Sequence, residues 1–266
     1  MVKIIDGKVI AEKIKDEVAK DIYQLNGPRP NLAIILVGER DDSKIYVALK
    51  EKEGRKIGVD THLYKMDGDI LESELLATIN FLNDDPTIDG ILLQLPLPQQ
   101  FNADKIIAAI NPLKDVDGFH PEHPKYIESP VLSAVKACLE EINFSAPDKS
   151  ACLMYNSEIF GQSLKDALSF LNLQVLPAEQ SSQADLLITA LGKPGYVKQN
   201  MIKDGAVIID IGITKEDGRV WGDVDFEDVK DKAAFITPVP GGIGPMTIAF
   251  LFKNVWEVYR RRHGLI

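Results

Sequence analysis

Apolar runs of strand length alternate along the chain with stretches of helical periodicity. Strands are predicted at residues 31–37, 59–66, 90–95, 151–155, 186–190 and 206–211. Amphipathic helices are predicted at 43–57, 72–82 and 103–110, each entered or left through Asp, Asn, Gly or Pro. This alternation is typical of a parallel sheet covered by helices and joined by right-handed crossovers.

The alternation stops at residues 114–130, which are rich in Asp, His, Pro and Gly. This segment predicts a long functional loop or an interdomain passage. Helical spacing follows at 131–142, and the alternation restarts near residue 151, so we expect two small domains. The segment 246–262 predicts a final helix, in which Arg260, Arg261 and Arg262 suit the negative end of the helix dipole.

Composition and charge limit the kinds of partner that the protein can bind. The 266 residues are 45% hydrophobic and 26% charged, as in an ordinary globular protein, and carry a formal net charge of −10. Nucleic-acid affinity depends on many Lys and Arg, so we expect no nucleic acid. Cys138 and Cys152 lack metal-ligand spacing and predict core thiols. No run resembles a signal peptide or a membrane span, and we expect a cytoplasmic protein.

The helix after the first long strand carries Ser43, Tyr46 and Lys50. Tyr46 and Lys50 are four residues apart and share one helix face. Together they offer a hydrogen-bond donor and a base, because desolvation can lower a lysine pKa from about 10.4 toward the working range. The alternative is a solvated lysine beside a half-buried tyrosine.

The strand GILLQLPLP holds one amide, Gln94, and ends in two prolines. Ligands of parallel sheets gather outside the carboxyl ends of the strands, which places Gln94 near a plausible site. The alternative is an amide whose hydrogen bonds are satisfied by backbone at a strand end.

The segment KDVDGFHP places Asp115 and Asp117 on an irregular stretch too polar to be core. One carboxylate can accept two N–H donors from an amino-heterocycle. A metal site of Asp115, Asp117, His120 and His123 is the alternative, but no second acidic or Cys cluster completes it, so no metal is predicted.

The segment ITPVPGGIGPMT runs through prolines and glycines directly into the final helix. Glycine lets backbone approach a ligand closely, and the start of a helix offers free N–H groups. A rigid turn without a ligand is the alternative.

These blocks, in order YVALK, GILLQLPLP, KDVDGFHP, GDVDF and TPVPGGIGPMT, resemble the bifunctional methylenetetrahydrofolate dehydrogenase/methenyltetrahydrofolate cyclohydrolase family from end to end. The resemblance implies a two-lobed α/β protein. Its amino-terminal three-layer folate lobe is residues 1–128, joined by a carboxy-terminal helix at 244–266. Its Rossmann-like parallel-sheet lobe is residues 129–243. It also implies a homodimer in one-carbon metabolism and purine biosynthesis.

The implied chemistry oxidises 5,10-methylenetetrahydrofolate with NADP or NAD, then hydrolyses the 5,10-methenyl product to 10-formyltetrahydrofolate. Lys50 matches the catalytic lysine of the family, Tyr46 a tyrosine at the folate, Gln94 the amide that positions the lysine, and Asp117 the carboxylate that reads the pterin edge. The resemblance further assigns to the folate pocket Leu95, Pro96, Pro238, Pro240, Gly241 and Gly242.

Departures from the family pattern fall in the second lobe. Pro-Cys-Thr-Pro is replaced by Ser129-Pro130-Val131-Leu132, and Gly-Arg-Ser by Tyr155-Asn156-Ser157. Residues 174–183 also read as shortened, with a missing crossover helix that would leave an adenosine groove poorly walled. The residues left to hold the cofactor are Asn156, Ser157, Gly161 and Ile213.

We therefore expect a cyclohydrolase whose dehydrogenase activity is weak or lost. Two alternatives stay open. One is a full bifunctional NAD(P)-dependent enzyme with rebuilt cofactor contacts, and the other is a non-catalytic folate-binding or partner-binding protein.

Overall fold

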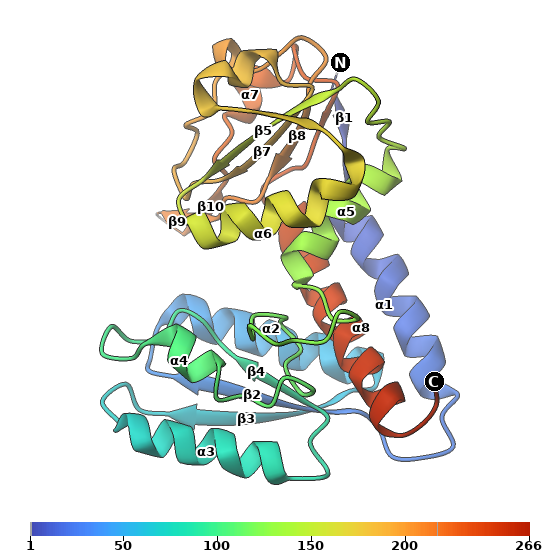
Figure 1. The fold of residues 1–266 in the computed structure, drawn as a ribbon, viewed down its shortest axis with the longest axis vertical. Coiled ribbons are helices and arrows are strands. Elements are labelled where there is room, and N and C mark those ends of the chain that lie inside the picture. The colour runs from blue at the N-terminus through green and yellow to red at the C-terminus, as the bar shows by residue number, and fades with distance from the viewer. Residues whose placement is uncertain (1, 217) are drawn as a thin grey trace. The chain divides into compact units, whose positions relative to one another are not determined.

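The computed structural model describes residues 2–216 and 218–266 and divides into two compact units, each built on its own parallel sheet (Figure 1). The three-stranded unit comprises Glu12–Pro130 and Ile248–Ile266. The six-stranded unit comprises Met1–Ala11 and Val131–Thr247. The expected fold class, a two-domain α/β protein with parallel sheets, is confirmed.

In the three-stranded unit the strand order is β3-β2-β4, with every pairing parallel. The strands are β2 (Asn31–Val37), β3 (Asp60–Met66) and β4 (Gly90–Leu93). The helices are α2 (Asp41–Ile57), α3 (Glu72–Asp84) and α4 (Ala103–Ile107), with parts of α1 (Gly7–Tyr23) and α8 (Ile243–Arg262). All of β2 after Asn31 is buried, because helices cover both faces of a parallel sheet.

Alternate side chains of β2 enter two separate cores. Leu32, Ile34 and Leu36 pack in one cluster with residues of α2 and with Phe252 of α8. Ala33, Ile35 and Val37 pack in the other with residues of α3 and α4. This period-two alternation gives the unit its three layers, helix, sheet and helix (Figure 1).

The six-stranded unit has the strand order β1-β11-β8-β7-β5-β6, again with every pairing parallel. The strands are β1 (Lys3–Ile4), β5 (Ser150–Tyr155), β6 (Gln174–Leu176), β7 (Leu186–Ala190), β8 (Val207–Asp210) and β11 (Phe235–Ile236). The helices α5 (Pro130–Glu141), α6 (Glu158–Leu168) and α7 (Phe226–Val229) and a hairpin of β9 (Thr214–Glu216) and β10 (Arg219–Trp221) complete it.

The chain leaves β5 for β6 on one side and then returns to β7 on the other side. The strand order therefore reverses at β5, and this is the point at which doubly wound sheets bind ligands. Between β6 and β7 stands a short 3-10 helix, Ala178–Gln183, instead of a full crossover helix.

Several elements differ from the prediction. The amino terminus does not lie wholly in the first lobe, because β1 pairs with β11 in the six-stranded sheet. Helices α1 and α6 were not predicted. The helix expected at 103–110 ends at Ile107, and its cap at Ala108 is followed by turns.

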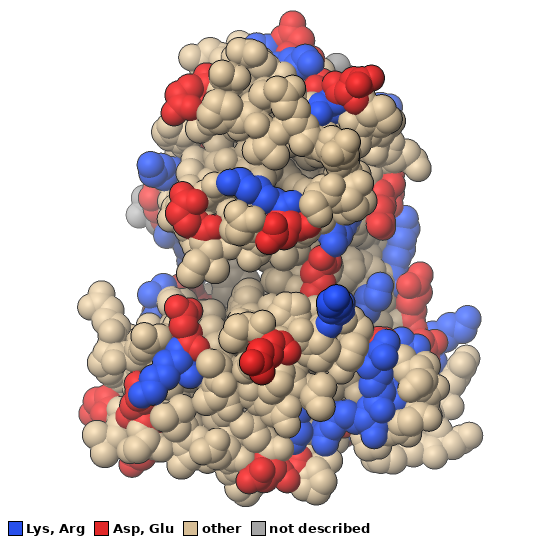
Figure 2. All heavy atoms as spheres, viewed as in Figure 1, with Lys and Arg blue, Asp and Glu red and all other residues tan. Residues whose placement is uncertain are grey.

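The surface carries mixed charge. Figure 2 shows acidic and basic side chains interspersed over the face in view. Over the described ranges, no helix has both the length and the apolar character needed to cross a membrane.

Candidate functional site

Three of the predicted site residues meet at one edge of the three-stranded sheet. Lys50 projects from α2, the helix that follows β2, and Gln94 follows directly after β4. A parallel bridge between Ile91 and Asp115 lays the next chain segment alongside β4. Asp117 therefore comes, like Gln94, just past the carboxyl ends of the strands, where ligands of parallel sheets bind.

The Gln94 amide is held in one orientation with its oxygen facing the lysine. Its Nε2 donates to the carbonyl of Leu95 at 2.7 Å, and its backbone N–H donates to Ile35 at 2.9 Å. Lys50 Nζ then donates to Gln94 Oε1 at 3.0 Å. Backbone therefore satisfies the Nε2 group of this amide, and the Oε1 atom fixes the position of the lysine amine.

Asp115 has a structural role in the loop that carries Asp117. Its carboxylate is buried and accepts the backbone N–H groups of Asp117 at 3.1 Å and His120 at 2.9 Å. On the other side, Asn254 of α8 donates to the carbonyls of Val116 and Glu128, each at 2.9 Å. The loop carrying Asp117 is thus held from both sides.

The environment shifts the pKa values of Lys50 and Asp117 in opposite directions. Burial lowers the pKa of Lys50, and the attraction of Asp117 only partly offsets this. Burial raises the pKa of Asp117 to about 7, opposed by the attraction of Lys50 and helped by repulsion from Asp115. A lysine amine held in this way can lose its proton closer to neutral pH than a solvated one.

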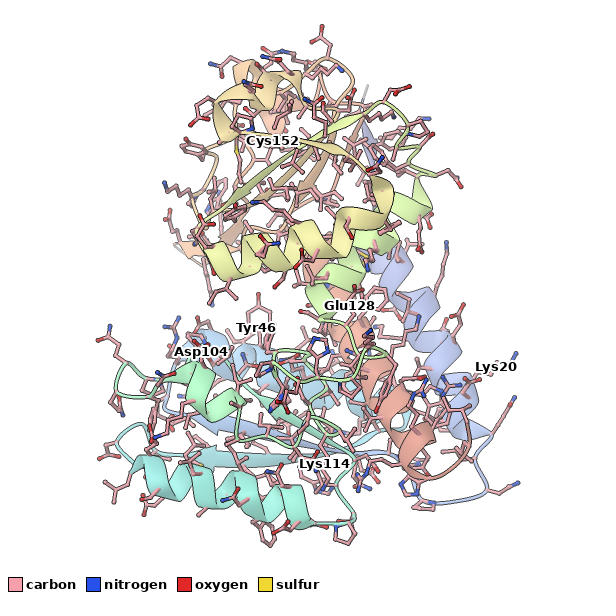
Figure 3. The ribbon with its side chains drawn as sticks, viewed as in Figure 1. Lys20, Tyr46, Asp104, Lys114, Glu128 and Cys152 are labelled. Carbon is pink, nitrogen blue, oxygen red and sulfur yellow. The ribbon has the colours of Figure 1, made fainter. Side chains whose placement is uncertain are left out.

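Tyr46 stands on the same face of α2 as Lys50, four residues earlier. Figure 3 shows its ring projecting from α2 away from the sheet of its unit. Burial raises the pKa of its half-buried phenol, so the hydroxyl keeps its proton and can donate a hydrogen bond.

We expect the raised pKa of Asp117 to make stability depend on pH. The folded protein binds this proton more tightly than the unfolded chain, in which the pKa of an aspartate is about 4. The stabilisation is complete below that pH and is lost as pH rises through about 7. The measurement is the free energy of unfolding in urea at acidic and at mildly alkaline pH. Between these two pH values it should decrease less for Asp117→Asn than for wild type. Equal decreases in the two proteins would contradict the assignment.

The alternative metal site does not form. The ring of His120 is already engaged, because Nδ1 accepts the N–H of Glu122 at 2.9 Å and Nε2 lies 3.3 Å from the carbonyl of Ala108. Within residues 2–216 and 218–266, no three His, Cys, Asp or Glu side chains are placed to hold a metal ion.

The remaining predicted folate residues lie in two loops. Leu95 and Pro96, joined by a cis peptide bond, follow Gln94 in the three-stranded unit. Pro238, Pro240, Gly241 and Gly242 lie in the six-stranded unit just before α8. Both glycines of that loop are required locally, since Gly241 has φ +111° and a Cβ on Gly242 would lie 2.7 Å from the Pro238 carbonyl oxygen. Their contacts with folate stay a prediction.

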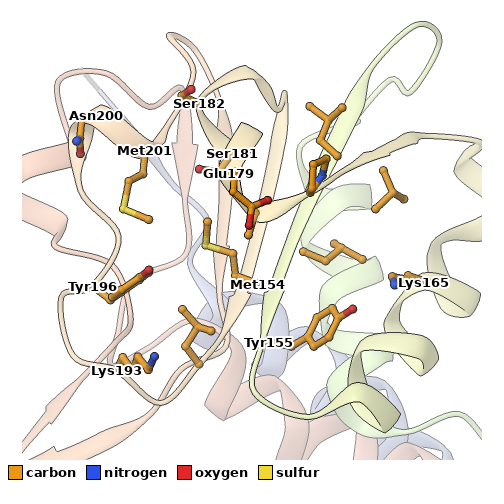
Figure 4. Close-up of a pocket in the computed structure, with 16 residues that line it drawn as sticks. Met154, Tyr155, Lys165, Glu179, Ser181, Ser182, Lys193, Tyr196, Asn200 and Met201 are labelled. Atoms are coloured by element: carbon orange, nitrogen blue, oxygen red, sulfur yellow. The ribbon is translucent and has the colours of Figure 1, made fainter.

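A cavity of about 770 Å³ opens at the carboxyl ends of β5, β6 and β7 in the six-stranded unit (Figure 4). Its walls combine strand-end side chains with the 3-10 helix after β6 and the loop after β7. Its polar and aromatic lining residues are Tyr155, Lys165, Glu179, Ser181, Ser182, Lys193, Tyr196 and Asn200. The segment expected to be shortened holds a 3-10 helix instead of a full crossover helix, and this helix forms part of the cavity wall.

None of the four predicted cofactor residues is among those lining the cavity. Asn156 Nδ2 donates to the Leu191 carbonyl at 3.0 Å, and Ser157 caps α6 by accepting the N–H of Phe160. Gly161 lies under the ring of Tyr155, and Ile213 is exposed. Their contact with a cofactor stays a prediction.

Sequence reasoning missed Glu179, Lys193 and Tyr196 in the cavity wall. A signal for Glu179 was present, since an acid soon after the second strand of a doubly wound unit is a known ribose-binding position.

Comparisons with known proteins agree on one family. Residues 5–117 match the model "Tetrahydrofolate dehydrogenase/cyclohydrolase, catalytic domain", and residues 130–263 match "Tetrahydrofolate dehydrogenase/cyclohydrolase, NAD(P)-binding domain". The bifunctional protein FolD of Sulfurihydrogenibium sp. is 42% identical over 280 residues, covering 97% of this chain and 98% of that protein.

Solved structures are similar over nearly the whole chain. The bifunctional FolD methylenetetrahydrofolate dehydrogenase/cyclohydrolase of Campylobacter jejuni superposes with a TM-score of 0.93 at 35% identity, covering 98% of this chain and 100% of that one. The Trypanosoma brucei enzyme, solved with NADP cofactor and inhibitor, has a TM-score of 0.91 at 29% identity, covering 98% of each chain. This chain therefore belongs to the tetrahydrofolate dehydrogenase/cyclohydrolase family.

Proposed function

We propose that the protein is bifunctional, oxidising 5,10-methylenetetrahydrofolate with a nicotinamide dinucleotide and hydrolysing the 5,10-methenyl product to 10-formyltetrahydrofolate. The observation that carries the proposal is the Lys50 amine, held 3.0 Å from Gln94 beside Asp117 at the carboxyl edge of the sheet. Matches to both domains of the family add support, as does a relative named bifunctional that aligns over almost the whole chain.

In the hydrolytic step, water adds to the cationic methenyl carbon, the C=N π electrons move to nitrogen, and the added water loses a proton to a base. The bond from that carbon to N5 then breaks, N5 takes up a proton, and the carbon stays on N10 as the formyl group. The neutral amine of Lys50 is the base in this proposal, with Gln94 fixing its position. A cationic substrate further disfavours a charged lysine. The Asp117 carboxylate accepts N–H donors from the pterin edge, and the Tyr46 hydroxyl donates to the folate.

In the oxidative step the dinucleotide supplies the hydride acceptor, and the protein contributes binding and orientation. The cavity of the six-stranded unit fits the adenosine half, because it combines strand-end position, apolar walls and a few polar side chains. The ring of Tyr155 covers Gly161, yet the cavity stays open beside that ring.

The first expectation, of a dehydrogenase that is weak or lost, is not supported. It depended on local replacements at Tyr155 and Asn156, whereas the NAD(P)-binding family model matches the whole of residues 130–263. A non-catalytic binding protein is also disfavoured, because simple binding has no need of a lysine base fixed by an amide. A cytoplasmic homodimer that serves purine biosynthesis stays a prediction.

The test uses purified protein and both folate substrates. With 5,10-methylenetetrahydrofolate and NAD or NADP, we expect protein-dependent formation of reduced cofactor, read by its absorbance. With 5,10-methenyltetrahydrofolate alone, we expect the methenyl absorbance to disappear faster than in buffer. Failure of the first reaction alone would leave only a cyclohydrolase, and failure of both would refute the proposal.

A further inference from the structure

We infer that the cavity at the ends of β5, β6 and β7 binds the adenosine ribose of NAD in preference to NADP, with Glu179 as the residue that sets this preference. The inference rests on the proposed oxidative function and specifies which dinucleotide it uses.

The position of Glu179 in the fold is the first argument. It lies in the 3-10 helix directly after β6, the strand that follows β5 and α6 in the chain. In doubly wound dinucleotide-binding folds, an acid soon after this second strand accepts a hydrogen bond from the ribose 2′-hydroxyl. Glu179 is exposed and lines the cavity, so its carboxylate is accessible to a ligand there.

The chemistry of the surrounding wall is the second argument. Ser181 and Ser182 line the same wall and offer hydroxyl groups to a sugar (Figure 4). A carboxylate is an acceptor-only group that suits the hydroxyls of a ribose. A 2′-phosphate would bring further negative charge beside this carboxylate, and like charges repel.

The cations of the cavity give the third argument. Its lining includes two lysines, Lys165 and Lys193. Lys165 Nζ lies 5.5 Å from the ring centroid of Tyr155, and Lys193 Nζ lies 5.4 Å from that of Tyr196. Among the described residues that line the cavity there is no arginine. Arginine is the residue that accommodates a 2′-phosphate in this fold, through its paired N–H groups.

The position next to Tyr155 strengthens this point. Asn156 stands there, and its amide donates to the Leu191 carbonyl at 3.0 Å. An amide tied to backbone supplies no positive charge for a phosphate. The cavity thus has an acid that suits the ribose 2′-hydroxyl of NAD. Its described lining has no guanidinium that would suit the 2′-phosphate of NADP.

The experiment compares equilibrium binding of NAD and NADP by calorimetry for wild type, Glu179→Gln and the control Asp204→Asn. Asp204 is an exposed acid of the same unit outside the cavity lining. We expect wild type to bind NAD more tightly than NADP by about tenfold or more, since a hydrogen bond to a charged group is worth about that factor. Glu179→Gln should reduce the ratio about tenfold, and Asp204→Asn should leave it unchanged.

A second variant, Glu179→Arg, should bind NADP more tightly than wild type does, which a merely structural role of Glu179 would not produce. The inference is overturned if wild type prefers NADP, if Glu179→Gln leaves the ratio unchanged, or if neither dinucleotide binds. NADP preference combined with NADP-dependent oxidation would overturn this inference alone and leave the bifunctional proposal standing. Absence of oxidation with either dinucleotide would instead count against the proposed oxidative function.

Discussion

Replacing Lys50 by methionine is expected to slow methenyltetrahydrofolate hydrolysis by about 10²- to 10⁴-fold, the range attributable to a positioned general base. Methionine keeps much of the length and apolar character of the side chain but has no amine to donate to Gln94 or to accept a proton. The loss should fall mainly on kcat, because Asp117 and Tyr46, the proposed substrate contacts, remain in place. The measurement is the initial rate of methenyl absorbance loss at saturating substrate.

Lys52→Met is the matched control, since Lys52 is an exposed lysine on the same helix. It should retain the wild-type rate. A Lys50→Met protein that hydrolyses the substrate at the wild-type rate would remove Lys50 from the mechanism. Gln94→Leu gives a further check, because losing the amide oxygen frees the lysine amine and should lower kcat without eliminating it.

Truncating Phe252 to alanine is expected to cost about 3–5 kcal/mol of unfolding free energy, the usual range for a buried phenylalanine. Phe252 is fully buried in the core that joins α2, β2 and α8. A Cβ placed on Gly54 would lie 3.1 Å from its ring, so the ring packs directly against the α2 backbone. Domains are stable by only about 5–15 kcal/mol, so this loss should lower the urea concentration at the unfolding midpoint of the three-stranded unit.

The control for this prediction is Phe81→Ala, in the same unit. Phe81 is 61% exposed on α3, so its truncation should change the unfolding free energy by only about 0.5 kcal/mol. Equal urea midpoints for Phe252→Ala and Phe81→Ala would show that α8 does not support this core.

The three-stranded unit could be predicted closely from sequence because its signals are local. The run NLAIILV became β2 with the predicted bounds, and the amphipathic stretch after it became α2. Tyr46 and Lys50 share a helix face by spacing alone. The contact between Gln94 and Lys50 could not be predicted without the register of the sheet. The contact of Asn254 with the Asp117 loop could not be predicted either, because α8 is far away in the chain.

The elements that were missed had weaker or misread signals. In α1, Ile10, Ile14, Val18 and Ile22 recur every four residues and would have predicted a helix, but the frequent charges between them hid this pattern. β1, β6 and β11 have two or three residues each, too few for periodicity to detect. Such strands exist because the neighbouring strands supply their hydrogen bonds.

The nucleotide half shows the limit of reading a site by its expected motif. The replacements at Tyr155 and Asn156 and the shortened segment 174–183 suggested a degraded site. The segments after β6 and β7 instead form much of the cavity, with Glu179 and Tyr196 in its wall. Side chains far apart in sequence can rebuild a pocket, and only the strand order shows that they share one edge.

The position of Phe252 in the three-stranded core also has a consequence for synthesis on the ribosome. Residues 12–130 emerge first, but one face of their sheet is covered by α8 side chains that include Phe252, Val255 and Trp256. At about 5–20 residues per second, that helix is translated on the order of ten seconds later. During this interval the nascent chain exposes an apolar sheet face, and we expect it to need chaperone protection until translation ends.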